Sequence, residues 1–170
     1  MAAGTNQGGS LQAGSVQAGS LLDRLTDLSP DARRDARSSP WDEMREFKAS
    51  ICRDLAALLN TRRAEQDFPP GYEEATNSLL SFGVADFTSY NLKNSVEQEK
   101  VRRSIERAIR EFEPRLTRVT ISIDKPDPLR PVLQFQVAAL LRTEPADEPV
   151  VFGIALHRES RRIGVSGGGQ

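Results

Sequence analysis

The residues whose types and spacing could do chemistry stand together in the tripeptide Glu113-Pro114-Arg115. Proline has no backbone N–H and disfavours the helical conformation in the preceding residue, so a helix is predicted to end near Phe112 and leave Glu113 extended. Residues two apart in an extended segment face the same side. We therefore expect the Glu113 carboxylate and the Arg115 guanidinium to project together from a stiff junction, toward each other or toward a partner.

This pair of charges suits binding better than catalysis. A glycoside hydrolase needs two carboxyl groups, one of which has a raised pKa and donates a proton. Glu113 is a candidate for that proton donor, but the neighbouring Arg115 charge favours the ionised carboxylate. Taken alone, the tripeptide is slightly better explained as a helix stop with a surface ion pair than as a functional site. Such an ion pair contributes roughly 0 to 1 kcal/mol to stability.

The remaining sequence contains no pattern typical of a catalytic, metal or phosphate site. A zinc site needs several Cys or His ligands, and the chain offers only Cys52 and His157. No serine lies in a nucleophile-elbow sequence, and the glycine run 167–169 lacks the lysine and following helix of a phosphate-binding loop. We therefore predict no metal, no cofactor and no enzymatic activity. Cys52 is expected to be a buried small hydrophobe in a reducing compartment.

Two helices must position the tripeptide, and both are indicated by apolar residues at three- and four-residue spacing. The first is predicted to begin at Ser39 and Pro40, a capping residue followed by a proline suited to the first helical position, and to run to about Asn60. The second is predicted from Ser95 to near Phe112. Its outer side is expected to carry a mainly solvated charged row at four-residue spacing, formed by Arg102, Glu106 and Arg110.

The connection between these helices is predicted to be mostly irregular because it contains Pro69-Pro70-Gly71. A short helix is predicted over residues 73–81. Gly83 is expected to supply the left-handed residue that ends it.

The C-terminal third changes from helical to strand periodicity. Apolar and polar residues alternate in three runs, 119–123, 133–141 and 150–156, which are separated by two breaks that contain prolines. Short polar turns between such runs are typical of an antiparallel meander. Helices before strands indicate an α+β domain, with the helices packed on a small antiparallel sheet of three or slightly more strands.

The chain of 170 residues is long enough for one domain with a hydrophobic core. Its first 20 residues are rich in Gly, Ser, Ala and Gln, a composition typical of disordered segments. The predicted division is a disordered tail over 1–19, an amphipathic segment and linker over 20–38, the α+β domain over 39–158, and a flexible C-terminal tail over 159–170.

The amphipathic segment is defined by a stripe of leucines at helical spacing, which are Leu21, Leu22, Leu25 and Leu28. One or two turns of helix are not stable alone in water, so this segment is expected to dock. The sequence leaves open whether it docks on its own domain or on a partner.

The charge balance excludes one class of function. With 23 basic and 24 acidic residues the net charge is −1, which lacks the signature of a sequence-independent nucleic-acid binder. No segment approaches the roughly 20 apolar residues that span a bilayer, and the N-terminus does not resemble a secretory signal. We therefore expect a cytoplasmic protein without membrane insertion.

Four segments taken in order, 20–25, 53–63, 81–86 and 112–116, resemble the TssE family of baseplate subunits of bacterial type VI secretion systems. The last of them contains the intact Glu113-Pro114-Arg115. The TssE family is similar to the wedge protein of contractile phage-tail baseplates, whose family label includes the word lysozyme. The resemblance covers about residues 20–158 and leaves out both tails.

The resemblance implies a non-enzymatic scaffold in the cytoplasmic baseplate at the inner membrane. It implies that Glu113, Pro114 and Arg115 contact the wedge core of TssF and TssG, with other baseplate subunits as further partners. It also implies a platform on which the TssB and TssC sheath begins to polymerise, and it suggests that an edge strand pairs with a sheath segment. The alternatives are a peptidoglycan hydrolase and a free-standing protein-binding adaptor.

Overall fold

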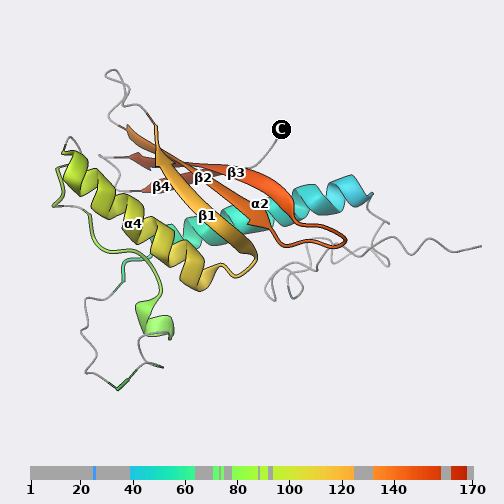
Figure 1. Cartoon of the computed structure of the whole chain (residues 1–170), viewed down its shortest axis with the longest axis horizontal. Coiled ribbons are helices and arrows are strands. Elements are labelled where there is room, and N and C mark those ends of the chain that lie inside the picture. Colours follow the sequence, from blue (N-terminus) through green and yellow to red (C-terminus); the bar gives the residue numbers. More distant parts are fainter. Residues whose placement is uncertain are drawn as a thin grey trace, which may run out of the picture.

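The computed structural model shows helices packed on one face of a four-stranded antiparallel sheet (Figure 1). The elements in chain order are α2 (Pro40–Asn60), η1 (Leu79–Ser81), α4 (Ser95–Phe112), β1 (Leu116–Ile123), β2 (Val132–Leu141), β3 (Glu148–His157) and β4 (Ile163–Gly167). The structure describes residues 25, 39–63, 71–72, 74, 78–87, 89–91, 94–124, 132–157 and 162–167.

Both long helices begin and end where the sequence predicts. The Ser39 hydroxyl caps α2 by accepting a hydrogen bond from the Asp42 N–H at 3.2 Å, and Pro40 occupies the first turn. The Asn94 side chain caps α4 by accepting from the Val96 N–H at 2.9 Å. The apolar stripes of both helices are buried: Phe47, Ile51, Leu55, Leu58 and Leu59 on α2, and Val101, Ile105, Ala108 and Ile109 on α4.

The sheet has the strand order β1-β2-β3-β4, and every neighbouring pair is antiparallel. Alternate residues of the strands point to the helix-covered face and are buried, among them Phe135, Val137, Phe152 and Ile154. Helix α4 packs mainly on β1, and α2 packs mainly on β4. This arrangement confirms the predicted α+β class and the predicted antiparallel meander.

The prediction of a flexible tail over 159–170 was wrong for residues 163–167, which form β4. This strand pairs with β3 from Leu156↔Ile163 to Phe152↔Gly167. The Asn60 side chain at the end of α2 also binds both backbone groups of Ile163, each at 2.9 Å. Only two apolar residues lie in this glycine-rich strand, so its sequence lacks a strand signal, and long-range pairing holds it in place.

Strand β1 contains a β-bulge directly after the helix–strand junction. Thr117 pairs with Leu140 and Thr120 with Ala138, so β1 has one residue more than β2 in this interval. Arg118 takes up the extra residue with a φ of +51°, and Val119 is buried. The Arg110 guanidinium of α4 donates to the Val119 carbonyl at 2.9 Å. The bulge therefore brings Leu116 and Val119 to the same buried face.

Between the helices, the structure describes a short 3₁₀ helix, η1, within the segment predicted to be helical; most of residues 73–77 lie outside the described ranges. The predicted left-handed conformation of Gly83 is confirmed, with a φ of +110°. Its role differs from that of a helix terminator alone. The chain after Gly83 runs beside the end of α2, where the Val84 N–H donates to the Thr61 carbonyl at 3.0 Å. A Cβ on Gly83 would collide with that carbonyl oxygen.

Some predictions fall outside the described ranges. Residues 1–19 and the segment 20–38 do so, apart from Leu25. Within the described ranges, Cys52 is half-buried, and burial raises the pKa of its thiol. His157 is exposed at the end of β3. No helix in the described part of the chain is long and apolar enough to span a bilayer.

We predict that Gly83→Ala destabilises the fold more than Gly71→Ala. Both glycines have a positive φ, +110° and +100°, so alanine strains the backbone at both sites, at a cost of roughly 1 to 3 kcal/mol. At Gly83 the added Cβ also meets the Thr61 carbonyl, while at Gly71 no atom of the described residues lies within 4 Å. Urea denaturation should give a free energy of unfolding at least about 1 kcal/mol lower for Gly83→Ala than for Gly71→Ala. Equal losses would contradict the close approach.

Candidate functional site

The Glu113-Pro114-Arg115 tripeptide forms the tight connection between α4 and β1. Glu113 follows the last helical residue, and its N–H still donates to the Ile109 carbonyl at 2.9 Å. Its backbone has left the helical region, as expected for a residue before proline, with φ −123° and ψ 76°. The Glu113 carbonyl then accepts from the Leu116 N–H at 3.1 Å, where the strand begins. The chain thus passes from helix to strand within three residues.

The two charged side chains of the tripeptide bind each other. The Arg115 Nε donates to Glu113 Oε1 at 2.6 Å, and Arg115 Nη2 donates to Glu113 Oε2 at 2.5 Å. This two-point geometry is the strong form of a carboxylate–guanidinium pair. The side chains are 5% exposed for Glu113 and 18% exposed for Arg115. The alternative of a surface ion pair was therefore wrong about position, because Glu113 is buried and Arg115 is mostly covered, whereas Pro114 is exposed.

Helix α2 supplies further partners that the sequence analysis did not identify. Arg115 Nη2 also donates to Asp54 Oδ2 at 2.6 Å, and Arg115 Nη1 lies 3.4 Å from the Ser50 hydroxyl. The Arg115 guanidinium carbon is 5.9 Å from the centre of the Phe47 ring. We name Ser50, Asp54, Glu113 and Arg115 the Arg115 cluster. A signal for it exists in the sequence, since Ser50 and Asp54 are polar, four residues apart and adjacent to the apolar stripe of α2.

The electrostatics of the Arg115 cluster keep the guanidinium charged. The hydrogen bonds to Glu113 raise the pKa of Arg115, burial opposes this shift, and Asp54 adds to it. Two carboxylates then face one buried cation, and the Arg53 guanidinium on the more exposed side lies 3.8 Å from Asp54 Oδ1. The cluster is thus neutral when Arg53 is included.

The Arg115 cluster is suited to structural support and not to proton transfer. Both oxygens of Glu113 accept hydrogen bonds from Arg115, so neither is free to contact a substrate. Among the described residues, no three His, Cys, Asp or Glu side chains are placed to hold a metal ion.

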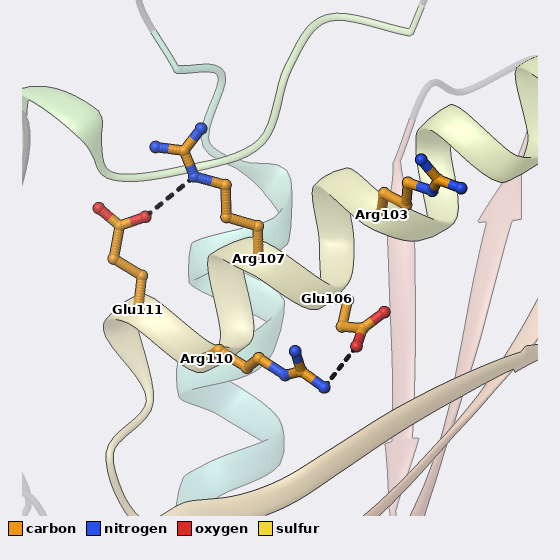
Figure 2. Close-up of a pocket in the computed structure, with 5 residues that line it drawn as sticks. All are labelled: Arg103, Glu106, Arg107, Arg110 and Glu111. Carbon is orange, nitrogen blue, oxygen red and sulfur yellow. Dashed lines mark hydrogen bonds and ion pairs between the residues drawn. The ribbon is translucent and has the colours of Figure 1, made fainter.

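A second group of charges lines a shallow hollow of about 430 Å³ on the outer side of α4, formed by Arg103, Glu106, Arg107, Arg110 and Glu111 (Figure 2). These side chains pair along the helix at four-residue spacing: Arg107 with Glu111 at 3.4 Å and Arg110 with Glu106 at 2.6 Å. Such pairs support the helix, although Glu111 Oε1 is buried without a hydrogen-bond partner among the described residues. The predicted charged row is formed, since Glu106 binds both Arg102, at 2.5 Å, and Arg110, at 2.6 Å. The prediction that the row is mainly solvated was wrong for Arg102 and Glu106, whose side chains are only 22% and 18% exposed because they pack against each other.

Comparison with known proteins adds one finding. The family model described as baseplate wedge protein gp25 matches residues 45–146, more than half of the chain. The match spans most of α2 together with α4, β1 and β2, and it includes the whole Arg115 cluster. No curated protein and no solved structure gives a significant match.

We predict that Glu113→Ala lowers the free energy of unfolding by about 3 kcal/mol, because it removes one partner of a buried charge pair. Arg115 keeps Asp54, which holds the loss at the lower end of the range for such sites. The matched control is Arg62→Ala. Arg62 pairs with Asp86 at 3.0 Å but is 58% exposed, so its loss should stay within about 1 kcal/mol. Chemical denaturation measures both, and similar losses would contradict the buried character of the Arg115 cluster.

Proposed function

The chain belongs to the baseplate wedge protein gp25 family, and on this basis we propose that it is a structural baseplate component of a type VI secretion system. The gp25 family is structural, so its members are wedge-like baseplate proteins that contact other baseplate subunits. The four ordered segments that resemble TssE support the assignment to a type VI secretion system. The main support for a structural baseplate role is the family match, which spans both helices and the Glu113-Pro114-Arg115 junction.

We assign the docking contact with TssF and TssG to the outer surface of this junction. Pro114 is exposed and stands between two residues that are fixed by their mutual ion pair. Glu113 is buried, so its role is to fix the position of the Arg115 side chain. Pro114 and the exposed edges of Arg115 and Asp54 contact the partner. A junction that is already ordered loses little conformational entropy on binding, which favours affinity.

We assign the contact with the TssB and TssC sheath to an edge of the sheet. The edge strands are β1 and β4. The Asn60 side chain occupies two backbone groups of β4, those of Ile163, whereas Arg110 occupies one on β1, the Val119 carbonyl, so β1 presents the more open edge. An added strand would gain main-chain hydrogen bonds there. The cytoplasmic side of the inner membrane is the location that this assembly implies.

The peptidoglycan hydrolase alternative is disfavoured by the state of Glu113. Its carboxylate is bound at two points by Arg115 and is 5% exposed, whereas a catalytic acid must be protonated and reach a glycosidic oxygen. We predict that the purified chain does not clear a suspension of cell walls in a turbidity assay. Clearing by the wild type that disappears in Glu113→Gln, while circular dichroism shows both to be folded, would overturn the structural assignment.

Docking is best tested at Pro114, because reversing the Arg115 charge would disrupt the interior cluster and confuse folding with binding. We predict that Pro114→Trp lowers co-purification with TssF and TssG by at least about tenfold, since a bulky side chain in the centre of an interface costs more than about 1.4 kcal/mol. The control is Val96→Trp, a substitution of a 61% exposed residue at the opposite end of α4. Val96→Trp should co-purify normally.

Thermal melts of both variants establish that they are folded. Undiminished co-purification of Pro114→Trp would refute the assigned contact. The absence of any stable complex of the wild type with TssF and TssG would favour the free-standing adaptor instead.

A further inference from the structure

The face of the sheet opposite the helices carries no charged side chain at the central positions of β2 and β3, although Arg118 in the bulge of β1 is exposed beside it. The outward positions of β2 and β3 alternate with buried ones, and the register places them side by side. They are occupied by uncharged residues: Gln134, Gln136, Ala138 and Leu140 on β2, and Pro149, Val151, Gly153 and Ala155 on β3. Thr120 and Ser122 of β1 and Gly164 and Ser166 of β4 extend the same face. In a chain with 28% charged residues, such a surface resembles the centre of an interface.

The most apolar part of this face lies at the end where β2 and β3 are joined. Leu140 pairs with Pro149, and Ala138 pairs with Val151, so the four side chains form one continuous group. Val151 is 52% exposed although β-branched residues usually pack against neighbours in a sheet. We name these four residues the outer patch.

The N-terminal half of α2 lies at the same end of the sheet as the outer patch. Lys48 Nζ binds Glu148 Oε1 at 2.7 Å, and Glu148 directly precedes Pro149. From there α2 extends past the joined ends of β2 and β3 (Figure 1). At its first turn Trp41 is 85% exposed and lies three residues before Met44, which packs against the core. The chain that precedes Ser39 therefore enters the domain at the end of the sheet that carries the outer patch.

We propose that the leucine segment 21–28 of the same chain docks on the outer patch. Leu25, which the structure describes, is helical and 75% exposed, so this residue and the patch each present an uncovered apolar surface. Eight residues at helical rise span about 12 Å, enough to cross the two strands of the outer patch, which lie about 4.8 Å apart. Residues 29–38 form a ten-residue connection that reaches up to about 33 Å, enough to pass around the end of the sheet.

The size of the outer patch favours a tethered occupant over a second copy. Four side chains on two strands cover on the order of 150 Å² of flat surface at strand spacings of about 4.8 Å. A stable interface between free proteins buries about 800 Å² per partner. A segment joined to the domain by a short connection binds at an effective concentration in the millimolar range, so a small apolar contact suffices.

Disulfide trapping in the full chain tests the proposal. In a Cys52→Ala background, one variant combines Leu25→Cys with Val151→Cys. The control combines Leu25→Cys with Arg107→Cys, which replaces a similarly exposed residue on the outer side of α4. Under mild oxidation at low protein concentration, we expect an intrachain disulfide at least about tenfold faster in the first variant, because docking raises the local concentration of the thiol introduced in the leucine segment at the patch.

A second measurement avoids the cross-link. The alkylation rate of Val151→Cys should rise several-fold when Leu21 and Leu28 are changed to Asp, while that of Arg107→Cys stays unchanged. Equal disulfide rates in the two pairs, an unchanged alkylation rate, or a concentration-dependent disulfide between chains would each overturn the proposal. The last outcome would assign the patch to a second copy. None of these results bears on the docking surface at Pro114.

Discussion

The interaction on which the rest of this structure depends is the binding of one guanidinium, that of Arg115, by groups from two separate parts of the chain. Glu113 lies at the end of α4, Arg115 lies just before β1, and Asp54 and Ser50 lie on α2. A buried cation is costly unless its hydrogen bonds are satisfied, so the conformations that satisfy them are strongly preferred. Arginine suits this role because its planar fork offers several donors in a fixed geometry. The cluster thereby fixes the angle at which α4 passes into β1 and the position of α2 beside it.

Two consequences follow for the surface. The exit of α4 is rigid on its inner side, so Pro114 is held outward at the apex of the connection without any flexible loop. The β-bulge at Arg118 adds a second link between α4 and β1, because Arg110 of α4 binds the Val119 carbonyl. Helix α4, the tripeptide and the start of β1 therefore form one rigid unit, which suits a docking element in a larger assembly.

Local signals in the sequence suffice for much of this fold. The helix ends are marked by interactions that act within a few residues, at Ser39-Pro40, Asn60 and Glu113. The strands are marked by the alternation of buried and exposed residues over 133–141 and 150–156. What could not be predicted depends on contacts across the chain. Strand β4 is held by its pairing with β3 and by Asn60, which is 103 residues from Ile163. Asp54 joins the candidate site through a contact with a residue 61 positions away. The extra residue at Arg118 likewise becomes visible only once β2 is in register.

Residue type alone would not separate the Arg115 cluster from the charged row on α4, because both consist of arginine and glutamate a few residues apart. The burial of Glu113 separates them, since its side chain is 5% exposed whereas Glu106 of the row is 18% exposed. Arg103 beside Glu99 is 74% exposed, and although Arg102 and Arg103 lower the pKa of Glu99 to about 2, water screens such a pair and can replace it. Glu113 is buried beside α2, so exchanging Arg115 for water would leave its buried charge unpaired. An exposed pair such as Arg103 and Glu99 can vary with little effect on the fold, whereas Glu113 and Arg115 depend on each other. Because Pro114 lies between these two paired residues, their ion pair also fixes the position of this exposed proline.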